Sequence, residues 1–215
     1  MCIRDSGGTL ENRCRFIDEI IAGIRAKLGR YPISVRICGD EMTDEPGFLT
    51  LEDGLEIGRH LEAQGIDCIN ISNGSSWNGN ANCEPFSYTP GWKKHVAKAF
   101  KEALSIPVIA NGDVFEPEDA VHILKYTGAD MAMLGRGCFG NPWLFARAQA
   151  ALEGRPVPPL PPLARRCETA VRQFRLSAAQ KGEHIACLEA RKHYAWYLKG
   201  VPYAGYYNCL LYTSP

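Results

Sequence analysis

The sequence predicts an α/β fold: the C-terminal half of a TIM (β/α)8 barrel, strands five to eight, followed by a small helical domain. Four strand-like apolar runs alternate with helical segments, which is the pattern of βαβ units around a parallel sheet. Glycine-rich turns follow the third and fourth runs, where a barrel binds phosphate, whereas a doubly wound sheet carries such a turn after its first strand. The chain has 215 residues, and a whole barrel needs about 250.

Apolar spacing places the elements along the chain. Residues 10–28 are expected to form the first helix, because apolar side chains recur at helical spacing until Gly29. Strands are expected at residues 33–38, 68–72, 107–110 and 131–134. Further helices are expected at residues 51–65 and 91–104. Two more are expected, one that begins at Pro117 and one that ends at Leu152.

The C-terminal part is predicted to be a separate helical domain. Five prolines within seven residues cannot continue a helix and predict a stiff linker. Beyond the linker, apolar stripes predict two helices, the second at residues 185–199. Both chain ends resemble translated sequencing-adapter peptides and are expected to lie outside the fold. The predicted domains are adapter-like residues 1–6, a half barrel at 7–155, a linker at 156–162, a helical domain at 163–205 and adapter-like residues 206–215.

Composition argues against the disordered, fibrous and membrane classes. Hydrophobic residues make up 46% of the chain and charged residues 22%, which is ordinary for a globular protein. No apolar run reaches the roughly 18 residues of a membrane span and the N-terminus lacks a signal-peptide pattern, so a cytoplasmic location without membrane contact is expected. The nine cysteines include no C-x-x-C pair, so we expect reduced thiols and no metal site.

The charge is uneven although the net charge is zero. Residues 165–199 carry eight Lys or Arg and three Glu, which leaves the remainder of the chain acidic. Such a segment meets a polyanion in some proteins and forms a solvated helical face in others. Charge alone leaves both interpretations open.

The glycines after the last two strands predict an anion site. Gly112 and Gly135 allow close backbone approach to a phosphate, and Arg136 supplies a bidentate donor at the same barrel end. Asn141 and Pro142 are residue types of an N-cap and a first helical turn, so the following helix is expected to aim N–H groups at the same anion. The alternative is that the glycines form ordinary turns and that Arg136 is a surface residue.

The first half of the chain carries a recognisable set of motifs. They are GGTLENRCRF, SVRICGDE, LTLEDGLEIGRHLEAQGIDCINISNG and EPFSYTPGWKKHVAKAFK. Through them residues 7–104 resemble the old yellow enzyme family, in its NADH:flavin oxidoreductase and dienoyl-CoA reductase branch. In that family the arginine of the SVR strand contacts the flavin, which implies that Arg36 contacts FMN here.

Residues 106–204 instead resemble the tRNA-dihydrouridine synthases, through IPVIANGDVFEPEDA, GADMAMLGRGCFGNPWLF and EARKHYAWYLKGVP. The resemblance implies that the Asn-Gly-Asp and Gly-Arg-Gly pieces bind the FMN phosphate. Their residues are Asn111, Gly112, Asp113, Gly135, Arg136 and Gly137. It also implies that the C-terminal helices hold tRNA, with Arg191 and Lys192 as phosphate contacts, which gives the basic segment a partner.

Each resemblance is incomplete. A dihydrouridine synthase carries His-Gly-Arg-Thr after its sixth strand, and this chain has Asn-Gly-Ser-Ser at residues 73–76. Its catalytic cysteine belongs to the first barrel half, as does the active-site histidine pair of the old yellow enzyme branch. That branch also has an iron–sulfur cysteine cluster where Cys138 stands alone in this sequence. No catalytic residue is therefore expected in this chain.

Together the resemblances imply a fragment of an FMN-dependent oxidoreductase that is inactive alone. The first candidate is a tRNA-dihydrouridine synthase with NAD(P)H as reductant, because it accounts for the helical domain. The alternatives are an ene-reductase acting on activated alkenes such as enoates or dienoyl thioesters, a non-catalytic RNA-binding module, and an inactive chimera. The two resemblances meet between Ala103 and Asp113, where we expect a junction of two genes. Open sheet edges predict aggregation or pairing with a second half-barrel.

Overall fold

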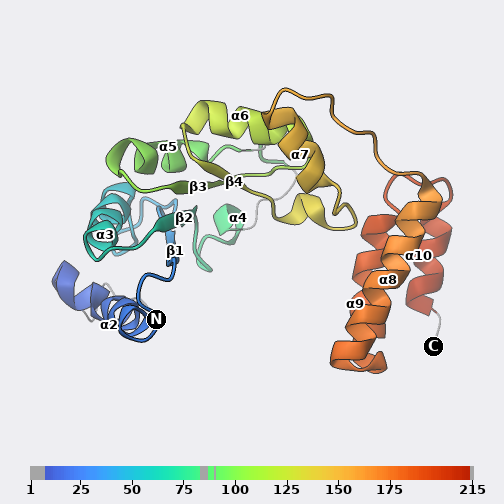
Figure 1. The fold of residues 1–215 in the computed structure, drawn as a ribbon, viewed down its shortest axis with the longest axis horizontal. Coiled ribbons are helices and arrows are strands. Elements are labelled where there is room, and N and C mark those ends of the chain that lie inside the picture. The colour runs from blue at the N-terminus through green and yellow to red at the C-terminus, as the bar shows by residue number, and fades with distance from the viewer. Residues whose placement is uncertain (1–7, 83–86, 90, 214–215) are drawn as a thin grey trace. The chain divides into compact units, whose positions relative to one another are not determined.

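The computed structural model describes residues 8–82, 87–89 and 91–213 (Figure 1). These residues form two compact units. The first takes in the described chain up to Val114 together with Asp119–Met133, and the second takes in Phe115–Glu118 and the chain from Leu134. The first unit contains the β-sheet and the second contains the C-terminal helices.

The sheet of the first unit has four strands, all parallel, in the order β1-β2-β3-β4. The strands are β1 (Ser34–Cys38), β2 (Cys68–Ser72), β3 (Val108–Asn111) and β4 (Met131–Met133). In the register Val35 pairs with Ile69, Ile69 with Val108, and Ile109 with Met131. The predicted α/β class and parallel sheet are confirmed, and each strand begins and ends within about one residue of its predicted bounds.

Helices connect the strands, as parallel pairing requires. They are α3 (Leu51–Ala63), α4 (Gly79–Asn82), α5 (Lys94–Ala103) and α6 (Pro117–Thr127), and a further helix, α2 (Leu10–Leu28), precedes β1. Thr50 and Asp53 form a capping box at the start of α3, with each side chain bonded to the other residue's main-chain N–H. Gly29 ends α2 at a positive φ of 60°, as its position in the sequence predicts.

The core of the first unit lies between one face of the sheet and the helices α3 and α5. Ile69, Ile71, Val108 and Phe100 are fully buried there. Two glycines make room for the Phe100 ring: a Cβ on Gly58 would lie 2.8 Å from the ring and one on Gly39 would lie 3.0 Å from it. Backbone also meets backbone here, since a Cβ on Gly54 would lie 2.2 Å from the Gly39 carbonyl oxygen.

The second unit is helical. It contains the short 3-10 helix η1 (Arg136–Cys138) and the α-helices α7 (Leu144–Leu152), α8 (Leu163–Lys181), α9 (Glu183–Tyr197) and α10 (Ala204–Thr213). Between α7 and α8 lies the proline-rich segment, which has neither helix nor strand. Arg147 of α7 donates to the Pro158 carbonyl oxygen at 2.9 Å, so this segment is tied to α7. None of the helices of the described residues is long and apolar enough to cross a membrane.

The predicted start of α7 is wrong in one respect. Asn141 is not the N-cap: α7 begins at Leu144 after Trp143, and no side-chain hydrogen bond caps it. The main-chain oxygen of Asn141 accepts from the Leu144 N–H at 3.1 Å, while its side-chain Oδ1 is buried without a hydrogen-bond partner. A tight turn therefore leads into this helix in place of the expected side-chain cap.

Three elements were not expected from apolar spacing. The 3-10 helix η1 follows β4 directly, and α4 lies in the polar connection between β2 and α5. The third, α10, runs through residues that resemble adapter peptide. Together η1 and α4 span seven residues, fewer than a periodic apolar pattern needs in order to be recognised, whereas α10 lies mostly in the residues expected to be adapter-like.

Candidate functional site

Polar side chains line the sheet face that points away from the buried core. Arg36 on β1 is exposed, and its Nη1 lies 3.8 Å from the Met133 sulfur on β4. Asn70 on β2 donates to the same sulfur at 3.5 Å and accepts from Asn111 of β3 at 3.1 Å. One residue from each strand thus contributes to a connected row, called the polar row below, which consists of Arg36, Asn70, Asn111 and the sulfur of Met133. Arg36 therefore points to the face of the sheet that lies away from the buried core.

Asn111 is the last residue of β3, and only one end of its side-chain amide makes hydrogen bonds. Its Nδ2 donates to the Ile71 carbonyl oxygen at 2.5 Å, and its Oδ1 is buried without a partner. A buried polar atom without a partner costs free energy, so a native protein normally provides a partner, a water or a ligand. The arrangement therefore points to a donor that approaches the carboxyl end of β3.

The connection after β2 carries further buried polar atoms without partners. Asn73 is 7% exposed, and its Oδ1 makes no hydrogen bond; the same holds for Ser75 Oγ and Trp92 Nε1. Two main-chain hydrogen bonds fix the backbone on either side of Asn73: Gly39 N to Ser72 O at 2.7 Å, and Gly74 N to Asp40 O at 2.8 Å. These three side chains were missed in the sequence, where residues 73–76 stood out only because they depart from His-Gly-Arg-Thr.

The cysteine at the end of β1 is structural. Cys38 Sγ donates to the main-chain oxygens of Asp40 at 3.3 Å and Gly74 at 3.5 Å. Burial raises the pKa of the Cys38 thiol above its ordinary value, so the protonated form is favoured at neutral pH. A protonated, hydrogen-bonded thiol is a poor nucleophile, and its contacts join the loops that follow β1 and β2.

The predicted phosphate residues follow the neighbouring strands β3 and β4 directly. Asn111, Gly112 and Asp113 belong to the first unit, and Gly135, Arg136 and Gly137 belong to the second. Packing accounts for Gly112 without any ligand, because a Cβ there would lie 2.8 Å from the Ile123 Cδ1 of α6. Gly135 differs, since a Cβ on it would meet nothing within 4 Å, so open space surrounds it.

A hollow of about 130 Å³ borders Gly112 on the helical side of this edge. Lys94 at the start of α5 and the exposed His122 of α6 line it together with Asp113. The Lys94 Nζ lies 4.5 Å from the centre of the Tyr126 ring, a cation–π contact that holds the ammonium group at the surface of the hollow. Lys94 was also missed in the sequence, where it is one of three lysines in this helix.

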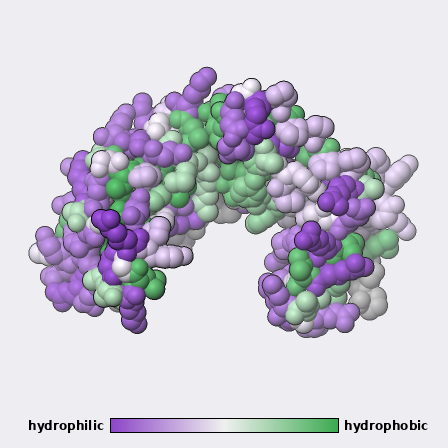
Figure 2. All heavy atoms as spheres, in the orientation of Figure 1, coloured by the Kyte–Doolittle hydropathy of each residue, from purple (hydrophilic) through white to green (hydrophobic). Residues whose placement is uncertain are grey.

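The basic residues of α8 and α9 divide into paired and unpaired groups. Arg165 pairs with Glu168 at 3.1 Å, Lys181 pairs with Glu189 at 2.8 Å, and Arg166 donates to the Tyr197 main-chain oxygen at 2.5 Å. Within the described chain, no hydrogen bond or ion pair is made by the side chains of Arg172, Arg175, Arg191, Lys192 and Lys199. The predicted RNA contacts Arg191 and Lys192 are thus half-buried and exposed, respectively, and available. In Figure 2 hydrophilic side chains cover much of these helices.

The last turn of α9 packs closely on the segment that follows β4. Gly140 has a φ of 66°, and a Cβ on it would lie 2.4 Å from the Trp196 carbonyl carbon and 2.5 Å from the Tyr197 nitrogen. Phe139 lies edge-on to two rings of α9, with centroids 6.4 Å from His193 and 5.9 Å from Trp196. The glycine-rich segment after β4 and the end of α9 are therefore one packed body.

Comparison with known proteins identifies the family. The family model described as "Dihydrouridine synthase (Dus)" matches residues 4–210, which is nearly the whole chain. The chain belongs to the dihydrouridine synthase family. A probable tRNA-dihydrouridine synthase of Mycobacterium leprae is 33% identical over 201 residues, which cover 93% of this chain and 49% of the relative. The tRNA-dihydrouridine synthase B of Pasteurella multocida is 43% identical over 104 residues, which cover 48% of this chain and 31% of the relative.

This member of the dihydrouridine synthase family is also similar to an oxidase and a reductase, as the motifs of residues 7–104 predict. An NADH oxidase of Thermoanaerobacter brockii is 37% identical over 151 residues, covering 69% of this chain and 22% of that protein. A solved structure of 2-naphthoyl-CoA reductase with 2-naphthoyl-CoA matches this chain with a TM-score of 0.60 and 30% sequence identity. The match covers 70% of this chain and 22% of the reductase chain. Both predicted resemblances are confirmed.

The chain spans about half the length of the Mycobacterium relatives that it matches. The bounds of the dihydrouridine synthase family match, residues 4–210, include residues 103–113, where the two resemblances were expected to meet. One family relationship thus extends over both sides of that point, and the origin of the junction stays a prediction.

Proposed function

We propose that this chain is the flavin-phosphate half of an FMN-dependent tRNA-dihydrouridine synthase, a protein that reduces uridine in tRNA with NAD(P)H as reductant. In this proposal β1 to β4 are strands five to eight of a TIM barrel, followed by the linker at 156–162 and the helical domain at 163–205. The observation that carries it is the unsatisfied Asn111 Oδ1 at the carboxyl end of β3, beside the polar row that contains Arg36.

The residues present fit a flavin. Asn111 Oδ1 would accept from a donor such as a ribityl hydroxyl, and the exposed Arg36 guanidinium would face the ring and stabilise negative charge on it. For the phosphate, the family resemblance implies main-chain N–H groups of Gly112, Asp113 and Gly135 to Gly137, with Arg136 as the bidentate cation. FMN itself supplies the hydride-transfer chemistry when bound. Catalytic proton donors are expected outside this chain.

The partner proposed for the helical domain is tRNA. Arg191 and Lys192 are unpaired cations in a segment with an excess of five positive charges, and such cations contribute to nucleic-acid binding through phosphate contacts. Arg166 is less suited to this role, because it holds the end of α9 through the Tyr197 and Lys199 carbonyl oxygens.

A second candidate is an ene-reductase that acts on an activated alkene or a dienoyl thioester. The likeness to NADH oxidase and to 2-naphthoyl-CoA reductase supports it, as does the Asn-Gly-Ser-Ser sequence at residues 73–76. In this case the basic helices would have no RNA partner, so RNA binding separates the two candidates.

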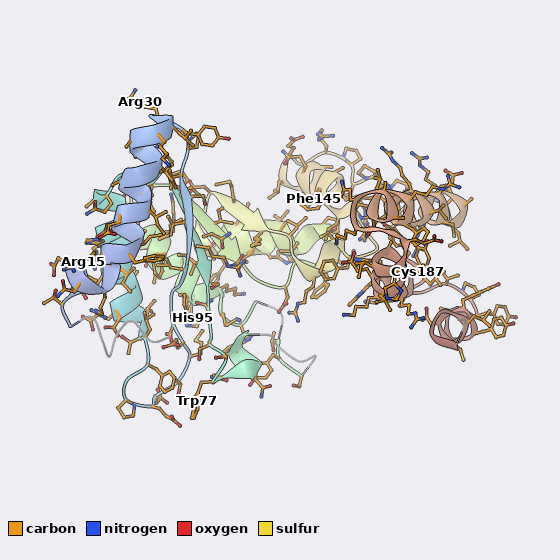
Figure 3. The ribbon with its side chains drawn as sticks, turned by 90° about the horizontal axis from the view of Figure 1, so that it is seen from below. Arg15, Arg30, Trp77, His95, Phe145 and Cys187 are labelled. Carbon is orange, nitrogen blue, oxygen red and sulfur yellow. The ribbon has the colours of Figure 1, made fainter. Side chains whose placement is uncertain are left out.

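The first experiment measures FMN affinity by quenching of flavin fluorescence. Arg136→Ala should weaken binding by about 10- to 100-fold, because it removes a charge-assisted, bidentate contact. Arg30→Ala is the matched control. Figure 3 places Arg30 at the opposite end of the sheet from Trp77, which follows the carboxyl end of β2. Equal FMN affinity in wild type and Arg136→Ala would exclude the proposed site.

The second experiment measures binding of an unmodified tRNA transcript at several salt concentrations. Lys192→Ala should weaken binding and reduce the slope of log affinity against log salt by about 1, as expected for one lost phosphate contact. Lys98→Ala is the control, because Lys98 lies on α5 of the first unit and pairs with Glu102. FMN binding without any tRNA binding would favour the ene-reductase.

A further inference from the structure

The segment after β4 and the end of α9 share a contact that no other residue type would permit. Gly140 is buried, and a Cβ on it would overlap the main chain of Trp196 and Tyr197 at 2.4 to 2.7 Å. Its φ of 66° is in the left-handed region, which side chains other than glycine rarely adopt. Backbone therefore packs directly on backbone, and neither segment can move far while the other stays in place.

Aromatic rings extend this contact on both sides of Gly140. Phe139 meets His193 and Trp196 edge-on, and Trp143 meets Tyr197 edge-on at a centroid distance of 6.5 Å. Tyr197 is 5% exposed and is fixed to α8, because its hydroxyl donates to Gln173 Oε1 at 2.9 Å. The last turn of α9 is thus held between α8 and the segment at residues 139–143.

Hydrogen bonds carry this fixation back to the glycines after β4. The Phe139 N–H donates to the Arg136 carbonyl oxygen at 3.1 Å, and the Asn141 N–H donates to the Cys138 carbonyl oxygen at 3.0 Å. The Cys138 thiol donates to the Gly135 carbonyl oxygen at 2.9 Å. A displacement at Phe139 therefore displaces Arg136 and Gly135 as well.

The residues proposed to bind RNA are next in sequence to the α9 residues that pack on Phe139. Arg191 and Lys192 immediately precede His193, whose ring meets Phe139. An RNA phosphate bound by these two residues would restrict the same turn of α9 that packs on Phe139 and Gly140. A flavin phosphate bound at residues 135–137 would restrict the opposite side of that packing.

We propose that the contact between α9 and residues 139–143 couples the two sites, so that RNA and flavin each strengthen the binding of the other. Phe139, Gly140 and Trp196 are positioning residues in this proposal, which rests on the proposed function. Because the two packed segments cannot move independently, a ligand that restricts one of them also restricts the other, so the second ligand meets a binding segment that is already held. Coupling of this kind is reciprocal and commonly amounts to about 5-fold or more in affinity.

The test is a thermodynamic cycle on the full chain. The Kd of FMN is measured by fluorescence quenching without RNA and with a saturating unmodified tRNA transcript, and the Kd of the tRNA is measured without and with FMN. Both affinities should rise by the same factor, about 5-fold or more. A contact that is merely structural would change the two affinities separately and would leave this factor at one.

Variants locate the route of the coupling. Phe139→Ala removes the rings' contact and should bring the factor close to one, Phe139→Tyr should restore it, and each ligand should still bind alone. Leu188→Ala is the control on the same helix, since Leu188 is 46% exposed and has no ring contact with Phe139; its factor should match that of wild type. If Phe139→Ala unfolds, Phe139→Leu replaces it, because leucine preserves apolar volume and removes the ring edge.

The possible failures are distinguishable. If FMN or tRNA does not bind to wild type, both the proposed function and this inference are overturned. If both bind and the factor is one, the proposed function stands and the coupling does not exist. If wild type shows coupling that Phe139→Ala and Phe139→Leu leave unchanged, the contact at Phe139 is not its route.

Discussion

Asn111 and Ile71 are joined across neighbouring strands by a side-chain to main-chain hydrogen bond of 2.5 Å. The bond uses the amide nitrogen of Asn111 and fixes its Oδ1 in a buried position without a partner. The amide nitrogen of Asn111 therefore determines both the orientation of the side chain and the position of the Oδ1 that a ligand would contact. That dependence makes Asn111 the most informative residue to change in the sheet.

Asn111→Asp should destabilise the fold by about 1–3 kcal/mol, because a carboxylate replaces the donor to Ile71 and is left buried. It should also weaken FMN binding. Urea unfolding and flavin fluorescence measure the two effects. Asn12→Asp is the matched control: Asn12 lies in the first turn of α2 and uses only its Oδ1, which accepts from Arg15 at 2.7 Å. A loss of stability in the control but not in Asn111→Asp would contradict this account.

Two glycine-to-alanine changes should shift the free energy of unfolding in opposite directions. Gly54→Ala should destabilise the fold by about 1–3 kcal/mol, because the added Cβ would lie 2.2 Å from the Gly39 carbonyl oxygen and forces backbone apart. Gly23→Ala in α2 should stabilise it by about 0.5–1 kcal/mol, since nothing lies within 4 Å and alanine favours the helix. Thermal or urea unfolding of both variants provides the comparison. Equal effects would show that α3 does not pack on the end of β1 as described.

Asp67 should make stability depend on pH in the acid range. The Ile33 main-chain N–H and then the Arg25 guanidinium, at 2.8 and 2.6 Å, lower the pKa of Asp67 below its ordinary value near 3.8. A lowered folded pKa means that the stabilisation is present above the unfolded pKa and is lost as pH falls through the folded pKa. We expect the urea midpoint to fall less steeply below about pH 4 in Asp67→Asn than in wild type.

Arg25→Gln serves as the comparison for Asp67→Asn. It removes the second cause of the lowered pKa and leaves the larger one, the Ile33 N–H, in place. It should therefore retain more of the acid dependence than Asp67→Asn does. Identical acid profiles for wild type and Asp67→Asn would rule out a contribution from this carboxylate.

The 215-residue chain should associate with itself or aggregate at micromolar concentration. In the described sheet β1 and β4 each pair on one side only, and the outer face of α2 exposes Phe16 by 71% and Ile20 by 41%. Unpaired strand edges and exposed apolar side chains are both covered in a closed barrel. Light scattering across a dilution series measures the association. A cooperative monomer would count against the half-barrel proposal.

Much of the fold was predictable because apolar spacing and turn residues agree with the final packing. Helix α2, for example, has both a stripe of isoleucines and a glycine at its end, and all four strands are short apolar runs after polar turns. The role of Asn141 was not predictable in the same way. Its position suits an N-cap, but the tertiary contact of its neighbour Gly140 with α9 sets the chain direction there.

The sequence predicts some residues of the candidate site but neither the others nor their arrangement. Arg36 and Asn111 follow from motifs, whereas Asn70, Asn73 and Ser75 emerge only from burial and from the hydrogen bonds that neighbouring strands make. A sequence does not state which of two sheet faces a side chain occupies when both faces are partly covered. That is why the direction of Arg36 required a structure.

The fit of Phe100 against Gly39 and Gly58 also constrains how this sequence can evolve. A larger residue at either glycine has no room while the ring is in place, and a smaller residue at position 100 leaves a cavity while the glycines remain. A smaller residue at position 100 would make room at position 58, so a compensating pair is tolerated there where a single change is not. A Cβ on Gly39 would still lie 2.8 Å from Val96 Cγ1 and 2.9 Å from Ile71 Cγ2. Among homologous proteins we therefore expect positions 58 and 100 to covary, whereas position 39 stays glycine.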